Sequence, residues 1–548
     1  MKIKNVTSYY FYRAKNKIFY ILLISLRMIP TFMNFDDKRY DNIEKMLSDC
    51  KSTTDSKLRY NIVLIRQLII KSLQLRKKYR LIDPQNIEES DEALLLKMGI
   101  SFRYIKENFE TDQGESSVKQ NDFQLQTLLS GFVSIVCPFT GKRLECKKSI
   151  LAAPNQPIYY RFESQTIYYL AVGRAGYGYP KLYLWFPEYQ VVILLTDKKL
   201  WNGRYEIDEF RAHMIQNWRE IQFYFASTAS KNICVLCDCG QFAHHLWNAL
   251  TGINKMIEAK LESHMDKFII AAEPFGPIDD IFPELGKCII ERRKFENLST
   301  LSIKDNLLLI RLGDCIISNG LIKRVRKTSL EKVPESISES VQEMREKYWP
   351  ILWVTLRTGN RTWESQCEGI VNIVIDIKKE YPRLSIIIDG FCIPYGKSHI
   401  GLHKQNELIE KEQKLVNNIE KAIGEDVHIT VTIGKTIAES VVIAEAADCY
   451  LAHHGSIQHK IGWIRNCPGV VHSNPDVLKG WTQYIRAINA RENPVTPVYL
   501  SHESTYNIAG AEPVKNLRWA NDYENYEFDY RVARDELLKI IKNIPVRV

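Results

Sequence analysis

The densest group of chemically capable side chains lies at residues 450–460, where the sequence reads YLAHHGSIQHK. An apolar strand ending at residues 450–452 would deliver these polar residues to the sheet edge at which open α/β folds bind ligands. A helix starting directly afterwards would point its free N–H groups at the same crevice, which favours a diphosphate. Gly455 allows close approach of the backbone, and Ser456 and Gln458 can donate hydrogen bonds to phosphate or ribose oxygens.

A structural alternative explains the same residues as an ordinary turn, with Gly455 in the turn and Ser456 as the helix cap. His454 is expected to face the crevice together with these two residues. His453 would then point to the other side, because neighbouring residues near a strand end alternate. We predict a ligand site formed by His454, Gly455, Ser456 and Gln458.

A second polar turn follows the apolar run at residues 351–356 and reads TLRTGNRTWESQ over residues 355–366. Arg357, Asn360 and Arg361 belong to this turn. A fixed guanidinium there would stabilise a leaving diphosphate as its negative charge develops, without a metal ion. The alternative is a polar loop whose arginines are solvated.

A third group is CVLCDCGQFAHHLWN, residues 234–248, in which a strand is followed by Asp238 and then by His244 and His245 at a helix start. A histidine that titrates near neutral pH can take the proton from an acceptor hydroxyl. We prefer His245, because Asn248 would lie near it on the same helix face. The alternative is a pair of helix histidines satisfied by packing or capping.

The elements that must position these residues alternate between strands and helices from residue 232 onward. The first series of strands reads NICVLCDCG, KFIIAAEPFG and NLLLIRLGD, and the second reads WPILWVT, LSIIIDGF, VHITVTIG, DCYLAHHG and GVVHSN. Apolar runs of this length between amphipathic helices predict parallel sheets covered on both faces. The fold class is therefore α/β, with two Rossmann-like domains at residues 229–345 and 346–500.

The remaining segments have other patterns. Residues 1–110 are expected to be mainly helical, residues 123–228 to form a β-rich subdomain, and residues 501–548 to form a tail. We expect a helix at residues 530–544 to cross back and brace the first Rossmann-like domain. Residues 1–33 are basic with a short apolar run, too short to span a bilayer, and are either a peripheral membrane contact or a buried helix.

Composition sets broad limits on a chain of 548 residues with a formal charge of +9. The basic residues are interleaved with acidic ones, which argues against a dedicated nucleic-acid binder and suits a protein that handles anionic substrates. Several of the 12 cysteines lie in apolar, strand-like runs, as buried free thiols do. We therefore expect a reducing compartment, the cytoplasm.

The segment ADCYLAHHGSIQHKIGW, residues 447–463, resembles GT-B glycosyltransferases. It is most similar to the family that includes plant β-xylosyltransferases and the secretory O-linked N-acetylglucosamine transferase, and to related bacterial polysaccharide glycosyltransferases. The resemblance is firm around this segment and loose over residues 230–500. A second histidine and a Gln-His pair stand where the family often has Gly-Ala and Asn.

This resemblance implies a GT-B-like pair of Rossmann-like domains that moves a sugar from a nucleotide diphosphate to a hydroxyl of a glycan or glycoconjugate, as in polysaccharide assembly. It implies catalytic roles for His245, His244 and Asp238 in the acceptor domain. It implies a donor site that holds the residues Arg357, Asn360, Arg361, Glu439, His454, Gly455, Ser456 and Gln458. No cofactor beyond the nucleotide sugar is expected.

We expect no metal site either. The sequence contains no Asp-x-Asp triplet, the usual manganese-diphosphate clamp of the other major glycosyltransferase fold. Zinc is a weak alternative, since Cys234-x-x-Cys237 falls within a predicted strand and the spacing of Cys137 and Cys146 is unsuitable. Cys239 adds a third thiol next to that strand.

Two other functions stay open, because a fold alone does not determine chemistry. One is a sugar-nucleotide epimerase or a pyruvyl-transferase-like enzyme, which a cleft carboxylate such as Glu439 would favour. The other is a glycan-binding or scaffold protein without activity, in which the β-rich subdomain is the working part and no nucleotide binds.

Overall fold

The computed structural model describes residues 79–109, 122–173, 175–196, 205–396, 402–481, 490–508 and 524–546. The predicted membrane contact at residues 1–33, and most of the predicted N-terminal helical region, lie outside these ranges. Within them, no helix combines the length and the apolar character that crossing a bilayer requires.

The first layer of the described chain is a six-stranded sheet in the order β1-β8-β7-β6-β5-β4. Its strands are β1 (Arg80–Ile82), β4 (Ser149–Leu151), β5 (Ile158–Glu163), β6 (Ile167–Val172), β7 (Lys181–Phe186) and β8 (Val191–Leu194). Neighbours from β4 to β8 are antiparallel, as expected for a β-rich segment, and only β1 is parallel to its partner β8.

Residues 80–82, which we expected to be helical, form the edge strand β1 instead. Ile82 is fully buried in this strand. The backbone groups of β1 pair with those of β8, so they do not need the hydrogen bonds of a helix. Helices and a hairpin surround the sheet: α4 (Glu89–Lys97), α5 (Phe102–Lys106), α6 (Phe123–Ser130), α7 (Tyr205–Gln216), α8 (Trp218–Ala226), β2 (Val133–Val136) and β3 (Arg143–Cys146).

The second sheet forms the core of the first Rossmann-like domain and is parallel throughout, in the order β11-β10-β9-β12. Its strands are β9 (Asn232–Cys237), β10 (Lys267–Ile270), β11 (Ile289–Arg292) and β12 (Leu307–Ile310). Its helices are α9 (Phe242–His244), a π-helix (His245–Leu250), α10 (Thr251–Glu258), α11 (Ile278–Ile281), α12 (Leu301–Lys304) and α13 (Asn319–Lys332). The sequence did not predict β11, which is only partly buried and so lacks an apolar run.

The third sheet forms the core of the second Rossmann-like domain, in the order β15-β14-β13-β16-β17-β18. Its parallel strands are β13 (Ile351–Thr355), β14 (Ser385–Asp389), β15 (His428–Val431), β16 (Cys449–His453), β17 (Gly469–His472) and β18 (Val498–Tyr499). Counted along the chain, this is the 3-2-1-4-5-6 order of a Rossmann fold. The predicted α/β class with two Rossmann-like domains is confirmed.

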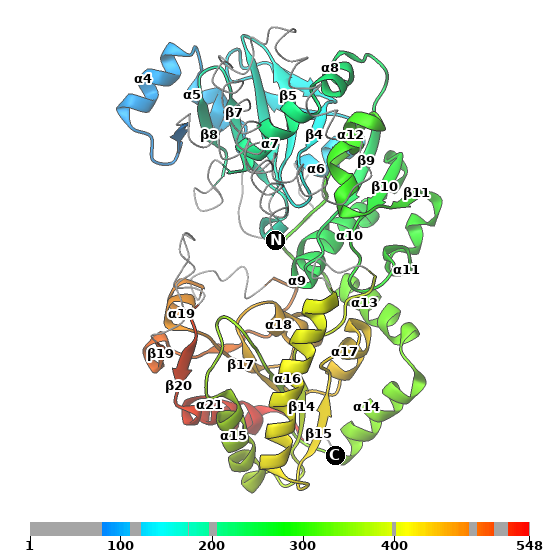
Figure 1. Ribbon diagram of the computed structural model, residues 1–548, viewed down its shortest axis with the longest axis vertical. Helices are drawn as coiled ribbons and strands as arrows, with labels where there is room; N and C mark the ends of the chain where they lie inside the picture. Colours follow the sequence, from blue (N-terminus) through cyan, green and yellow to red (C-terminus); the bar gives the residue numbers. More distant parts are fainter. Residues whose placement is uncertain are drawn as a thin grey trace, which may run out of the picture.

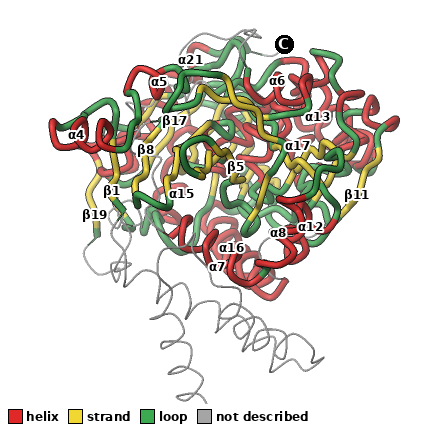
Figure 2. The backbone as a smooth tube through the Cα atoms, turned by 90° about the horizontal axis from the view of Figure 1, so that it is seen from above, coloured by secondary structure: helices red, strands yellow, loops and turns green. Residues whose placement is uncertain are grey.

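Helices cover the third sheet and link it to the rest of the chain. They are α14 (Glu335–Lys347), α15 (Gln366–Glu380), α16 (Leu402–Ile423), α17 (Ile437–Ala444), α18 (Ser456–His459), a π-helix (Lys460–Arg465), α19 (Pro475–Trp481) and α21 (Tyr530–Asn543). A short antiparallel pair, β19 (Thr505–Asn507) and β20 (Tyr526–Phe528), precedes α21. Viewed from above, strands run through the middle of the molecule and helices lie around them (Figure 2).

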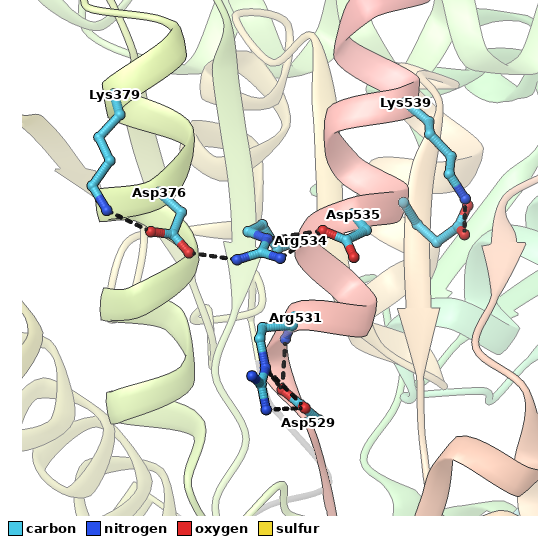
Figure 3. A network of polar contacts seen from close by, with 8 residues as sticks. Asp376, Lys379, Asp529, Arg531, Arg534, Asp535 and Lys539 are labelled. Atoms are coloured by element: carbon cyan, nitrogen blue, oxygen red, sulfur yellow. Dashed lines mark hydrogen bonds and ion pairs between the residues drawn. The ribbon is translucent and has the colours of Figure 1, made fainter.

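The closing helix α21 packs on the second domain, and not on the first as we expected. Arg534 on α21 forms an ion pair of 2.8 Å with Asp376 on α15, and it also contacts Asp535 (Figure 3). Leu537 on the same helix is buried in the core of the second domain. The apolar stripe of α21 is buried against its own domain, so the helix does not cross back to the first Rossmann-like domain.

The two Rossmann-like domains meet where α9 and α13 of the first approach α17 and α18 of the second (Figure 1). Trp463 and Val441 of the second domain belong to the same buried cluster as the core of the first. Trp247 and Trp463 lie with their ring centroids 5.5 Å apart. The predicted donor and acceptor segments therefore come from opposite sides of one interface.

Candidate functional site

The candidate site lies at the carboxyl ends of β13 and β16, where the strand order of the third sheet reverses. Crossovers leave these two neighbouring strands in opposite directions, which opens a crevice at such a point in α/β sheets. Arg357 follows β13, and His453 ends β16. A Cβ placed on Gly455 would lie 3.7 Å from Nη1 of Arg357. The structure thus brings together two turns that the sequence analysis singled out separately.

Gly455 has a backbone conformation that favours glycine at this turn. Its φ of +123° lies in a region that side-chain-bearing residues rarely adopt. The helical segment at residues 456–465 starts immediately after it. The turn therefore combines a glycine, the N–H end of a helix and a neighbouring guanidinium, which together favour an anion.

Arg357 is half-buried and held by its own loop. Its Nε donates to the carbonyl oxygen of Asn360 at 2.7 Å, and its Nη2 donates to the Oδ1 of Asn360 at 3.1 Å. Gln366 accepts from the Arg357 N–H at 3.1 Å and donates to the Arg357 carbonyl at 2.8 Å. The predicted residue Asn360 thus positions the arginine, and Gln366, which the sequence analysis did not select, anchors the turn.

His454 lies buried beside the two arginines of this loop. Burial, together with the charges of Arg361 and Arg357, lowers the pKa of His454 to about 3. The imidazole is therefore neutral at physiological pH, and the positive charge of this loop comes from the arginines. Arg361 is half-buried, with a φ of 54°.

His453 contacts residues of the neighbouring strands and not the crevice. Its Nδ1 lies 3.1 Å from Oγ1 of Thr355, and its N–H donates to the same hydroxyl at 2.9 Å. Its ring centroid lies 4.4 Å from that of His472 on β17. These contacts fix the ends of β13, β16 and β17 relative to one another.

Ser456 and Gln458 have different environments. The Oγ of Ser456 accepts a hydrogen bond of 2.9 Å from Nε2 of Gln241, which precedes α9 in the first domain. Gln458 is buried against Tyr450 and Tyr499. Ser456 thus lies at the interface between the domains, while Gln458 packs inside the second domain.

Glu439 is the N3 residue of a capping box on α17. Its Oε2 accepts from the Thr436 N–H at 2.7 Å and from the Thr436 hydroxyl at 2.8 Å. These hydrogen bonds occupy the carboxylate at the helix start. No feature of this geometry favours the epimerase alternative that rested on Glu439.

Asp238 lies at the corresponding point of the first Rossmann-like sheet, between the ends of β9 and β12. Its carboxylate forms a two-pronged ion pair with Arg311, with distances of 2.7 Å and 2.6 Å, and only 1% of the residue is exposed. Its Oδ2 also accepts from the N–H of Asn155, and Arg311 donates to the carbonyl of Gln156. The pair fastens the β-rich subdomain to this sheet.

The two histidines after Asp238 differ in access. His245 is fully buried, its Nδ1 lies 2.9 Å from the carbonyl oxygen of Cys239, and burial lowers its pKa to about 4. His244 is only partly buried, and burial lowers its pKa as well. Asn248 contacts His244 at 3.2 Å, and not His245 as we expected, because residues four apart on a helix face each other.

A buried polar cluster at the ends of β14 and β15 was missed from the sequence. Nζ of Lys460 lies 2.6 Å from Oδ1 of Asp389 and 2.9 Å from Oγ of Ser440. Glu412 of α16 accepts from the Phe391 N–H at 2.6 Å. Burial, aided by Asp389, raises the pKa of Glu412 to about 7. The signal available in the sequence was Asp389-Gly390, directly after an apolar strand.

Metal ligands do not gather in the described part of the chain: no three of its His, Cys, Asp and Glu side chains are arranged to hold an ion. The cysteines considered for zinc are Cys137, Cys146, Cys234, Cys237 and Cys239, and all are buried free thiols.

No family model and no curated protein matches this sequence. Among solved structures, a family 9 glycosyl transferase from Veillonella parvula DSM 2008 aligns at 10% identity and a TM-score of 0.31, covering 57% of this chain and 96% of the other. POFUT1 in complex with GDP aligns at 9% identity and a TM-score of 0.20, covering 50% and 99%. Similarities at these TM-scores carry no argument about activity.

Proposed function

We propose that this protein transfers a sugar from a nucleotide diphosphate donor to a hydroxyl of a glycan or glycoconjugate. The observation that carries the proposal is Arg357 lying against Gly455 at the point where the 3-2-1-4-5-6 strand order reverses. Open α/β sheets bind nucleotides in this crevice, and the arginine adds the charge that a diphosphate needs.

The donor side of the reaction is assigned to the second domain. Arg357 and Arg361 neutralise the diphosphate, and the first N–H groups of residues 456–465 supply hydrogen bonds. His454 lies near both arginines and is neutral, so it adds no charge of its own to the site. As the bond between the sugar and the diphosphate breaks, the leaving oxygen gains negative charge, which the arginines stabilise without a metal ion.

The acceptor side is assigned to the first domain, with His244 as the base. If Asn248 accepts from the Nδ1–H of His244, Nε2 of the same ring keeps a free lone pair. The acceptor hydroxyl gives its proton to this nitrogen while its oxygen bonds to the sugar carbon. His245 is too deeply buried for this role, and Asp238 is already committed to Arg311.

A thermal-shift panel tests the donor assignment. The full chain is mixed with nucleoside diphosphates and nucleotide sugars of each common base, with and without EDTA. We expect one base to raise the melting temperature, with EDTA present, and Arg357→Ala to abolish that rise. Arg531→Ala is the matched control, because Arg531 is exposed and pairs with its near neighbour Asp529.

Activity is the second test. With the donor identified, released nucleoside diphosphate is measured with and without a mixed glycan acceptor pool. Release that needs an acceptor supports transfer. Consumption of the nucleotide sugar without any acceptor would instead favour an epimerase, and the absence of any nucleotide-induced shift would overturn both readings.

A further inference from the structure

A pocket of about 930 Å³ opens on the β-rich subdomain, away from the crevice between the Rossmann-like domains. Its walls come from β5, β6, α7 and α8, which lie at the end of the molecule opposite the second domain (Figure 1). Its volume falls in the range of small-molecule binding sites. None of its lining residues has a place in the proposed transfer reaction.

The inner surface of the pocket is aromatic and apolar. Tyr169 and Met214 are buried at its floor, while Trp218 and Phe225 are half-buried in its walls. Phe223 is 76% exposed at the same site. A phenyl ring left in water forgoes the free energy that its burial would contribute. Such exposure beside other aromatic rings indicates a surface that a ligand covers.

The rim of the pocket carries three cations and one carboxylate. Arg161 pairs with Glu163 at 2.9 Å, and its guanidinium lies 5.1 Å from the ring centroid of Phe225. Lys148 donates to the backbone carbonyl of Phe225, and Arg219 is exposed at the edge. The rim is therefore net positive, and Arg161 is pre-oriented by its carboxylate and ring contacts.

We infer that this pocket binds an acidic glycan, one whose sugars carry carboxylate or sulfate groups. Aromatic faces attract the weakly positive C–H faces of a sugar ring, because the ring quadrupole is negative at its face. Guanidinium groups bind carboxylate and sulfate oxygens in a planar, two-pronged manner. A concave site with few charges suits a saccharide better than a membrane, which would need a protruding apolar surface.

The inference goes beyond the proposed transfer and stands without it. Affinity electrophoresis tests it with the full chain, in gels that contain polygalacturonate, heparin or neutral dextran. We expect at least one acidic polysaccharide to retard the protein, and dextran not to. The variant Phe223→Ala with Arg219→Ala should weaken that binding at least tenfold. Both side chains are solvent-exposed, so the fold should survive, which the melting temperature checks.

The matched control combines Tyr506→Ala and Lys327→Ala, an aromatic residue and a cation that are exposed elsewhere. It should bind the acidic polysaccharide like the wild type. Retardation by neither acidic polysaccharide, or equal retardation of the pocket variant and the control variant, would overturn the inference. So would pocket-dependent binding to vesicles of anionic lipid, or to a nucleotide, without any binding to the polysaccharides.

The nucleotide-induced thermal shift of the pocket variant should equal that of the wild type, which separates this test from that of the donor site.

Discussion

The two Rossmann-like sheets place charged residues at equivalent points and use them differently. In the first sheet, Asp238 and Arg311 fill the point between β9 and β12 with a buried ion pair. In the second sheet, the point between β13 and β16 holds a half-buried arginine next to a glycine. The first is closed by its own charges and by the loop at residues 155–156, while the second places two half-buried arginines, Arg357 and Arg361, beside the crevice.

This difference supports our proposal that the nucleotide binds to the second domain. Equivalent topology supplies a crevice in both domains, but a phosphate site also needs backbone N–H groups and positive charge. A carboxylate at this point, as in the first domain, would repel a diphosphate. The pairing with Arg311 converts the same position into a structural joint with the β-rich subdomain.

The largest effect is expected from breaking that joint. Arg311→Met leaves the carboxylate of Asp238 buried without its counter-charge, which costs about 3–5 kcal/mol of unfolding free energy. Urea denaturation of the variant should show this loss. The double variant Asp238→Leu with Arg311→Met should recover a large part of it, because no charge stays buried. If Arg311→Met were as stable as the wild type and inactive, Asp238 and Arg311 would instead belong to the reaction.

The second effect concerns the open point in the second domain. Arg357→Lys keeps the charge but loses the planar guanidinium that Asn360 orients. We expect kcat/KM for transfer to fall by about 10²–10³ in Arg357→Ala, the usual loss for one electrostatic donor, and by less in Arg357→Lys. Unfolding free energies should change little in both. Equal losses in the two variants would show that geometry, and not charge alone, carries the role.

The third effect tests the carboxyl group near this crevice as a function of pH. Burial raises the pKa of Glu412 to about 7 from an ordinary 4.5, so the folded protein keeps a proton that the unfolded chain loses between these values. The unfolding free energy should therefore fall as pH rises through this window and level off above it. Glu412→Gln removes this dependence and should be more stable than the wild type at pH 8 by about 1–3 kcal/mol. At pH 4 the two should differ little, and a variant that is less stable at pH 8 would contradict the assignment.

Much of the fold could be predicted from the sequence, because buried parallel strands such as Ile351–Thr355 are uninterrupted apolar runs. Two edge strands, β11 and β18, could not be predicted. Ile289–Arg292 has only two apolar residues, the first of them exposed, and Val498–Tyr499 has only two residues in all. Their strand character comes from pairing with a neighbour, which local patterns do not record.

The turns of the site could be predicted from the sequence, but the distant side chains that pair with the site residues could not. Arg357, Gly455 and Ser456 follow apolar strands, so their place at the sheet edge follows from the sequence. Asp238 showed the same local pattern, but its partner Arg311 lies far along the chain and no local signal reveals the pairing. Lys460 was missed for the same reason, since Asp389 and Ser440 reach it only in the folded sheet.

The smallest effect is expected at the hydrogen bond between Gln241 and Ser456, which joins the two domains beside the crevice. A single bond of this kind contributes about 0.5–1.5 kcal/mol, so Gln241→Ala should weaken donor binding by about tenfold at most if domain contact supports the site. When Ser456 acts only through this bond, Ser456→Ala has the same effect, and the double variant loses no more. When Ser456 also binds the diphosphate, Ser456→Ala weakens binding further than Gln241→Ala does. Titration of the three variants with the donor nucleotide separates the two cases. If no variant loses affinity, Ser456 does not belong to the site. Arg357 would then be the main contact between the crevice and its anion.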